Sequence, residues 1–85
     1  MRPYYHPIFK KQFRKLPKNI QNHFKDRLDI FLDNMFHSLL NNHSADSVYP
    51  GWRSINVTGD YRAFFEVKEK DMVIFMKIGT HSELY

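Results

Sequence analysis

The chain of 85 residues is long enough for one domain with a single modest core and too short for a second, so we expect one domain over residues 1–85. It has no cysteine, which excludes disulfide bonds and thiolate chemistry, and its five histidines lack the paired spacing of a zinc site, so we expect no metal. The formal net charge of +4 favours a polyanionic partner such as nucleic acid, although an acidic protein would match it equally well.

The first half of the chain predicts a short strand followed by two helices. Residues 1–13 lack an uninterrupted apolar segment, so we expect neither a signal peptide nor a membrane span, and a cytoplasmic location. Aromatic residues open the chain as a short strand, and Pro7 is typical of the first turn of a helix. Pro17 interrupts that helix, after which apolar residues recur at spacings of three and four and predict a second helix over residues 18 to about 40. Together the helices form an antiparallel hairpin.

The second half predicts a loop and then an antiparallel sheet. Residues 41–51 are rich in Asn, Ser, Asp, Pro and Gly, which favours a loop. From Trp52 onward the pattern alternates, and it predicts strands over residues 52–57, 60–67 and 72–78, with Gly79 ending the last one. Trp52, at the first strand's start, is expected to seal the seam between helices and sheet. The predicted fold class is α+β: a short strand, a helical hairpin and a three-stranded antiparallel meander, with the helices on one face.

This strand order brings several polar side chains to one end of the open face of the sheet. The set comprises Ser54, Asn56, Asp60, Arg62, Lys77 and His81. A guanidinium, a carboxylate and an imidazole at one place can bind a phosphodiester and transfer protons around it. Exposed ionisable clusters are also common on sheets, so this placement by itself leaves a merely solvated surface open.

Two motifs in this half carry a family resemblance. The stretch GWRSINVTGDYRAFFEV and the later FMKIGTHSELY, with GDYR and GTHSELY as the specific signals, resemble the RelE/ParE superfamily of bacterial toxins from type II toxin–antitoxin systems, and its YafQ-like branch in particular. The resemblance covers nearly the whole chain, although the helical part matches only in pattern. It implies an endoribonuclease that cleaves messenger RNA, typically in the ribosomal decoding site, by attack of a ribose 2′-hydroxyl on the adjacent phosphate.

The resemblance also implies catalytic roles for four residues. A free imidazole titrates at about pH 6.5, so it can exist in either form at cytoplasmic pH. This property suits His81 as the general acid that protonates the departing 5′ oxygen. Asp60 or His43 would accept the proton of the 2′-hydroxyl, and Arg62 would offset the charge that builds on the phosphate. We expect no cofactor. His43 lies in the predicted loop, and its spacing to Gly51 matches the YafQ-like pattern.

Four further residues are candidates for binding the substrate. Asn56 stands where the YafQ-like pattern carries a further histidine, and asparagine can hydrogen-bond RNA but cannot exchange a proton near neutral pH. Tyr85 would either stack on a base or cap the edge of the core. Lys77 lies on the last predicted strand, which returns to the same end of the sheet. Arg53 would have to reach around the sheet edge, because alternation places it on the face of Ile55.

A toxin of this kind implies a cognate antitoxin that wraps it with a segment folding on binding. Five of the thirteen Lys and Arg residues fall between Lys10 and Lys18, so this segment is a candidate contact for the antitoxin or for ribosomal RNA. Two alternatives to the ribonuclease stay open. ParE-type members poison DNA gyrase by binding without being nucleases, and a non-toxic RNA-binding module would also fit the charge.

Overall fold

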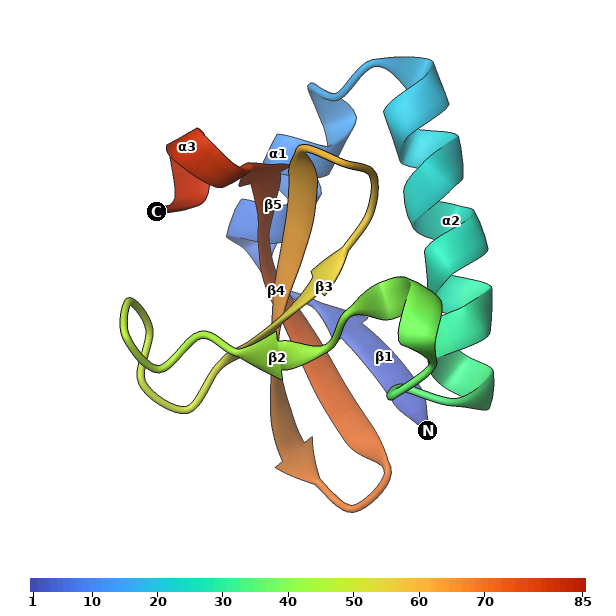
Figure 1. The fold of residues 1–85 in the computed structure, drawn as a ribbon, viewed down its shortest axis with the longest axis vertical. Helices are drawn as coiled ribbons and strands as arrows, with labels where there is room; N and C mark the ends of the chain where they lie inside the picture. The colour runs from blue at the N-terminus through green and yellow to red at the C-terminus, as the bar shows by residue number, and fades with distance from the viewer.

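The computed structural model describes residues 1–85 and shows an α+β fold, as predicted (Figure 1). A sheet of five strands is flanked by two longer helices and carries two short helical turns. The elements in chain order are β1 (Arg2–Tyr5), α1 (Pro7–Arg14), α2 (Lys18–Asp33), the 3₁₀ turn η1 (Ser38–Leu40), β2 (His43–Ser44), β3 (Arg53–Asn56), β4 (Tyr61–Glu69), β5 (Met72–Thr80) and α3 (His81–Leu84). None of the helices combines the length and apolarity that crossing a membrane requires.

The predicted meander forms the centre of the sheet. The strand order is β1-β5-β4-β3-β2, in which β3, β4 and β5 are antiparallel neighbours. β1 pairs in parallel with β5, and β2 pairs antiparallel with β3. The near-continuous apolar run of β5 is therefore explained by its internal position between β1 and β4.

Two cross-strand rows of the sheet position the residues of interest. In one row Ser54 faces Phe64, which faces Lys77; in the other Asn56 faces Arg62, which faces Gly79. Directly opposed residues of antiparallel strands share a face, so these side chains lie on the side opposite to Ile55.

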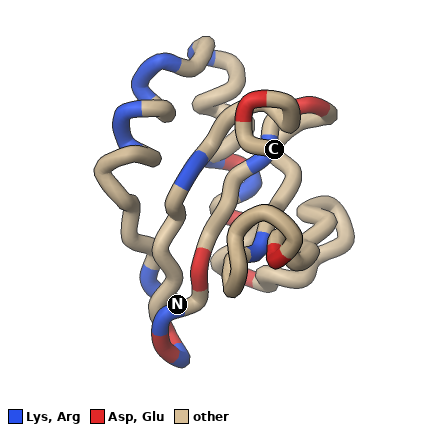
Figure 2. Tube along the Cα trace, turned by 90° about the vertical axis from the view of Figure 1, so that its left-hand side faces the viewer, with Lys and Arg blue, Asp and Glu red and all other residues tan.

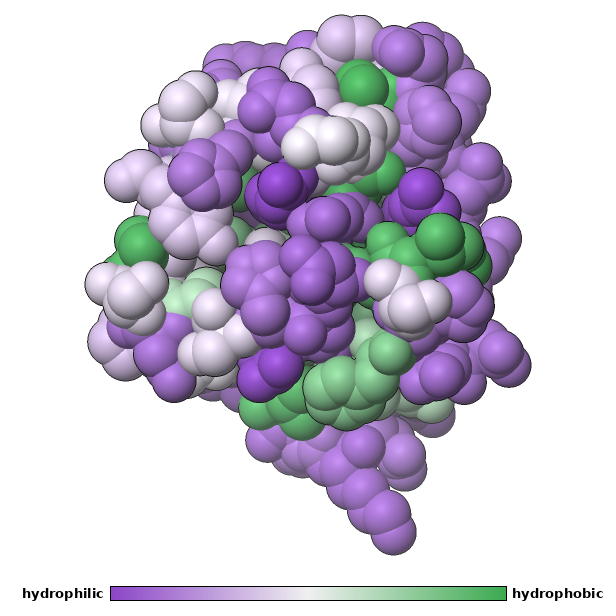
Figure 3. Space-filling model, viewed as in Figure 1, coloured by the Kyte–Doolittle hydropathy of each residue, from purple (hydrophilic) through white to green (hydrophobic).

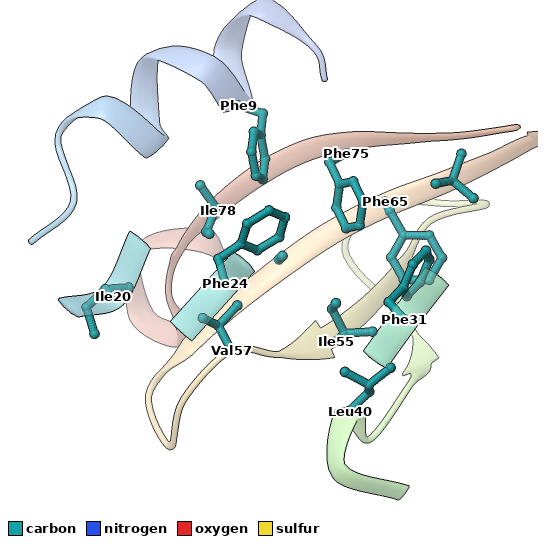
Figure 4. Close-up of a cluster of buried hydrophobic side chains, with 12 residues drawn as sticks. Phe9, Ile20, Phe24, Phe31, Leu40, Ile55, Val57, Phe65, Phe75 and Ile78 are labelled. Atoms are coloured by element: carbon teal, nitrogen blue, oxygen red, sulfur yellow. The ribbon is translucent and has the colours of Figure 1, made fainter. Parts of the chain in front are cut away.

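The main core lies between the helical hairpin and the sheet. It contains twelve buried residues, among them Phe9, Phe24 and Phe31 from the helices and Phe65 and Phe75 from the strands. These five rings meet one another at centroid distances between 5.0 and 5.8 Å, and the core side chains point toward one another (Figure 4). Edge-to-face and tilted contacts of this kind add to the stabilisation from burial.

The opposite face of the sheet is partly covered by the segment before β3 and by α3. Phe64 is buried there with Ala45 and Leu84, and Tyr49 and Trp52 pack against this second cluster. Trp52 therefore lies on the face away from the helical hairpin, and the expectation that it seals the helix–sheet seam is wrong. Its strand alternation, which groups it with Ser54, indicates the correct face.

The second helix is shorter than its sequence pattern predicts. It ends at Asp33 rather than near Leu40, because Asn34 adopts an extended conformation and its side-chain oxygen accepts a hydrogen bond from the amide of Phe36 at 3.1 Å. Asparagine often ends a helix in this way, since its side chain competes for backbone hydrogen bonds. Of the apolar residues beyond Asp33, Leu39 and Leu40 belong to η1, where Leu40 is fully buried.

The loop and the C-terminus are also more regular than predicted. His43 and Ser44 form the short edge strand β2 within the predicted loop. β5 continues one residue past Gly79, and α3 follows it at once. Thr80 and Glu83 form a capping box, and this Thr-x-x-Glu spacing is a helix-start signal that strand periodicity does not detect. In the view of Figure 3, apolar side chains form small patches separated by polar ones.

Candidate functional site

The turn between β3 and β4 meets the start of α3 at one end of the sheet. The amide of His81 donates a 3.0 Å hydrogen bond to the carbonyl of Asp60, and Arg62 faces Gly79 across the β4–β5 ladder. The backbones of His81, Asp60 and Arg62 therefore lie at one end of the sheet, although they come from separate stretches of the chain. Asn56 joins them as the cross-strand partner of Arg62.

The guanidinium of Arg62 is held by the turn that precedes it. Its Nη1 donates to the carbonyls of Thr58 and Gly59 at 3.1 Å each and to that of Tyr61 at 3.2 Å. These bonds fix one side of the planar group, whereas Nε and Nη2 donate to no group of the protein. Their N–H groups can bind a phosphate oxygen, because guanidinium offers donors on two edges of one plane.

The side chain of His81 is exposed at the first position of α3, and the capping box fixes its backbone. Thr80 and Glu83 exchange hydrogen bonds on either side of it, at 2.8 Å from the Thr80 amide to the Glu83 carboxylate and 3.3 Å in return. The bonds donated by the amide and then by the hydroxyl of Thr80 lower the pKa of the Glu83 carboxyl. The imidazole of His81 makes no hydrogen bond within the protein, so both of its nitrogens can reach a ligand.

Three rings form a continuous stack at the C-terminus. The ring of Tyr85 meets buried Phe64 edge to face at 5.3 Å and lies against the imidazole of His81 at 4.3 Å with an interplanar angle of 24°. Tyr85 is nevertheless 43% exposed. It thus both packs on the second core cluster and presents aromatic surface to the solvent, two uses that the sequence leaves as alternatives.

Lys77 lies beside this stack and is anchored by a tyrosine. Its Nζ donates to the hydroxyl of Tyr49 at 3.1 Å and lies 4.8 Å from the centre of that ring. The same hydroxyl donates to the carbonyl of Leu84 at 3.2 Å, and the ring stacks on Trp52 at 4.5 Å. Tyr49 therefore links Lys77, Trp52 and α3. Sequence reasoning missed Tyr49, because its only signal is an aromatic residue inside a polar loop.

His43 shares this face of the sheet but lies at its other edge. It faces Ser54, which faces Phe64 and then Lys77, so the four form one cross-strand row. Strands are about 4.8 Å apart, which puts the backbone of His43 about 14 Å from that of Lys77. The structure thus does not bring His43 together with His81.

The hydrogen bond of His43 defines which of its nitrogens is free. Its Nδ1 lies 2.7 Å from the carbonyl of Asn41, and a carbonyl can only accept, so Nδ1 carries the proton. Neutral His43 therefore exposes the lone pair of Nε2. By contrast, His6 and His37 use Nδ1 to accept from backbone amides two residues ahead.

Two polar atoms of β3 face the site without a partner. The hydroxyl of Ser54 and the side-chain oxygen of Asn56 are buried and make no hydrogen bond. Buried polar atoms are normally paired with protein or ordered water. A hydrogen-bond donor from solvent or a ligand would satisfy Asn56 at the place where it faces Arg62.

Arg53 lies apart from the other candidates. Its Nε donates to the side-chain oxygen of Asn42 at 2.7 Å, and its guanidinium lies 5.6 Å from the ring of Phe36. Its β3 position puts it on the side of Ile55, as the alternation predicts. No group of three or more His, Asp or Glu side chains is arranged to hold a metal ion.

Together, the fold and this site define a small basic α+β protein with cationic, imidazole and aromatic side chains at one end of its sheet. The family model of the ParE toxin of type II toxin–antitoxin systems (parDE) matches residues 4–85, and the chain belongs to this family. A search of curated protein sequences found no match.

Solved structures share the whole fold with this chain at low sequence identity. YafQ from E. coli strain BL21(DE3) matches with a TM-score of 0.81 at 19% identity, over 99% of this chain and 97% of that one. The toxin in the E. coli DinJ-YafQ toxin-antitoxin complex matches with 0.79 at 18%, over 99% and 96%. The RelB-RelE antitoxin-toxin complex from Methanococcus jannaschii gives 0.75 at 20%, over 96% and 94%. These likenesses show that the chain has the fold of YafQ and RelE.

Proposed function

We propose that this toxin is an endoribonuclease that cleaves messenger RNA in the ribosomal decoding site, inhibits translation in the cytoplasm and is neutralised by a cognate antitoxin. The observation that carries the proposal is the hydrogen bond between the His81 amide and the Asp60 carbonyl, which joins the backbones of these two residues at the end of the sheet where the strand of Arg62 begins. Similarity to YafQ and to RelE, both solved in complexes with antitoxins, supports both parts of the proposal.

The imidazole, the carboxylate and the guanidinium each have a separate role in the proposed reaction. A base removes the proton of the ribose 2′-hydroxyl, whose oxygen attacks the adjacent phosphorus. The bond from phosphorus to the 5′ oxygen breaks as His81 gives that oxygen a proton, which leaves a cyclic phosphate and a free 5′-hydroxyl. Arg62 donates hydrogen bonds to the phosphate oxygens as their negative charge grows, an effect worth about 3–4 kcal/mol in comparable sites.

We assign Asp60 as the base because of its position. It is joined to His81 through the backbone, whereas His43 stands at the far edge of the sheet. The carboxylate is exposed, so RNA must cover it before it can work as a base. His43, with a free Nε2, binds the RNA at a neighbouring nucleotide in this scheme.

The aromatic rings near His81 provide a surface on which the nucleobases of the RNA can stack. Single-stranded RNA is commonly held by stacking on aromatic side chains, with cations nearby for the phosphates. The exposed face of Tyr85 and the half-buried ring of Trp52 fit this use. Asn56 faces Arg62 across the β3–β4 ladder. Lys77 is held by Tyr49, whose ring stacks on Trp52. Arg53 has its guanidinium engaged by Asn42 and contributes least to this surface.

Non-enzymatic inhibition of DNA gyrase is the second candidate, because the matching family model is that of the ParE toxin. Induction of the toxin followed by mapping of nucleic-acid ends separates the two. The ribonuclease proposal predicts breaks at particular codon positions of translated messages, whereas gyrase poisoning predicts DNA breaks with intact messages. His81→Ala should abolish both the RNA breaks and the growth arrest. His23→Ala, at an exposed histidine of α2 without a hydrogen bond, is the matched control and should leave both unchanged.

A further inference from the structure

The hydroxyl of Tyr49 lies within the ring cluster on the face of the sheet opposite to the helical hairpin, and the proposed reaction gives it no role. The ring of Tyr49 stacks on Trp52 at 4.5 Å and meets Phe64 at 5.2 Å. Phe64 is fully buried and also meets Tyr85 edge to face at 5.3 Å. Tyr49 and Tyr85 therefore pack on the same buried ring, and Tyr85 in turn stacks on the imidazole of His81.

The two hydrogen bonds of this hydroxyl have a defined direction. The Nζ of Lys77 can only donate, so the oxygen of Tyr49 accepts this bond of 3.1 Å. The carbonyl of Leu84 can only accept, so the single proton of the hydroxyl is donated to it at 3.2 Å. Because a cation polarises the hydroxyl, Lys77 strengthens the bond to Leu84. Lys77 is the cation in contact with the Tyr49 ring, whereas the Lys and Arg positions of α1 and of the start of α2 belong to the helical layer (Figure 2).

The bond to Leu84 is one of two hydrogen bonds that hold α3 on the rest of the protein. α3 is a single turn of four residues, and a turn of this length is not stable alone. At its start the amide of His81 donates to Asp60, and at its end the carbonyl of Leu84 accepts from Tyr49. The first bond fixes the backbone of His81 but does not restrain its ring. The second fixes the end of the turn, from which Tyr85 stacks on that ring at 4.3 Å.

We propose that Tyr49 is a positioning residue for the reaction, whose hydroxyl fixes the end of α3 and thereby the orientation of the His81 ring. The inference rests on the proposed function, in which His81 is the general acid, and adds a residue that acts through it. Proton transfer requires the imidazole to point at the departing oxygen, and a misplacement of about 1 Å can cost about 100-fold in rate. When the end of α3 loosens, the imidazole leaves its stack on Tyr85, and fewer molecules hold it ready for the transfer.

Tyr49→Phe tests the catalytic consequence, because it removes the hydroxyl and retains the ring that packs on Trp52 and Phe64. With toxin in excess over ribosomes that carry messenger RNA, the single-turnover cleavage rate should fall about tenfold. The affinity of the toxin for these ribosomes should change less than about twofold, since the stacking surface stays. The matched control is Tyr4→Phe, which deletes the hydroxyl of an exposed tyrosine on β1 that makes no hydrogen bond, and it should leave both quantities unchanged.

The orientation of the His81 ring is measured by NMR on the full-length toxin without RNA. Stacking on Tyr85 places the imidazole in the ring current of the phenol, which shifts the Hδ2 and Hε1 signals of His81. Tyr85→Ala gives the signals of the unstacked ring. Tyr49→Phe should move the His81 signals toward this reference, and Tyr4→Phe should not. A mere loss of stability would leave these signals in place as long as the protein is folded.

A double-mutant cycle shows whether Tyr49 acts through His81. In the His81→Ala protein the positioned ring is absent, so Tyr49→Phe should lower the residual cleavage rate less than about twofold. An equal loss in both backgrounds would separate Tyr49 from His81 and overturn the inference.

Three further results would overturn it. Unchanged His81 signals in Tyr49→Phe would show that the hydroxyl does not set the ring, and shifted signals with a normal rate would show that this orientation does not limit the reaction. Weaker ribosome binding with an unchanged rate at saturation would assign Tyr49 to RNA binding through Lys77. A failure of the ribonuclease proposal is distinguished by a wild type that does not cleave RNA, because the NMR signals test the link from Tyr49 to His81 without any reaction.

Discussion

The amide of His81 donates a 3.0 Å hydrogen bond to the carbonyl of Asp60 and thereby ties the first residue of α3 to the turn between β3 and β4. Because β4 begins directly after this turn, the same contact fixes His81 relative to Arg62. The backbone position of the proposed general acid is thus set by hydrogen bonding, and its ring, which stacks on Tyr85, keeps both nitrogens without a hydrogen bond.

Substitution of Arg62 should lower the RNA cleavage rate far more than it lowers the stability of the fold. Arg62→Ala should lower the RNA cleavage rate at least about 100-fold, because it removes the charge stabilisation at the phosphate. It should also cost about 1 kcal/mol of unfolding free energy, since the carbonyls of Thr58, Gly59 and Tyr61 lose a donor. Arg62→Lys retains the charge but not the planar donor set, and should recover only part of the rate. Cleavage kinetics and chemical denaturation check this, and a normal rate in a less stable Arg62→Ala protein would contradict it.

The stability of the capping box at the start of α3 should depend on pH through the carboxyl group of Glu83. Its pKa is lowered in the folded protein from its ordinary value of 4.5, chiefly by the hydrogen bond from the Thr80 amide. A lowered pKa means that the capping contribution is fully present above 4.5 and is lost as the pH falls through the lower folded value. The NMR shift of the Thr80 amide should therefore change in one step below 4.5.

Glu83→Gln is the control for this titration, because its side-chain oxygen can still accept from Thr80 but carries no titrating carboxyl. The step at the Thr80 amide should be absent in this variant. A wild-type step at or above 4.5 would show that the capping box does not favour the carboxylate.

Phe75 should be among the most sensitive positions of the core. It is fully buried and contacts the rings of Tyr5, Phe9, Phe24, Phe31 and Phe65. Phe75→Ala should cost about 3–5 kcal/mol, a large part of the stability of a small domain. Phe36→Ala is the control at a ring that is 63% exposed, and should cost at most about 1 kcal/mol through its contact with Arg53. Equal losses in denaturation would contradict this core.

Asn56→His should raise the cleavage rate. The YafQ-like pattern that the sequence resembles carries a histidine here, and a titrating ring opposite Arg62 would add a proton acceptor that asparagine lacks. Single-turnover cleavage rates measured over a series of pH values should rise by about tenfold at most. The rate should also show a new dependence on pH near neutrality. No gain, with an intact fold, would show that this position serves binding alone.

The order of the main elements was predictable from the sequence, because their patterns are local. The three-and-four spacing of the second helix and the alternation of the three long strands both reflect one buried face. The end of α2 was not predictable, since apolar residues continue after Asp33 and only the hydrogen bond of the Asn34 side chain marks where the helix ends. The strand β2 has two residues and depends on pairing with β3, which no local pattern indicates.

The candidate site was predictable as far as strand register reaches. Register places Asn56 opposite Arg62 and returns the chain to His81 at the same end of the sheet. The stacking of His81 on Tyr85 and the anchoring of Lys77 by Tyr49 depend on the helical turn of α3 and on a loop, both of which tertiary packing decides. The distance of His43 from His81 likewise follows from the strand order rather than from spacing in the chain.

The most direct test of the account is the single-turnover cleavage rate of messenger RNA bound to ribosomes, measured with His81→Ala and with the wild type. The account predicts a loss of at least about 100-fold, with unchanged thermal unfolding, because the 5′ oxygen would leave without a proton donor. A folded His81→Ala toxin that cleaves at the wild-type rate would contradict it.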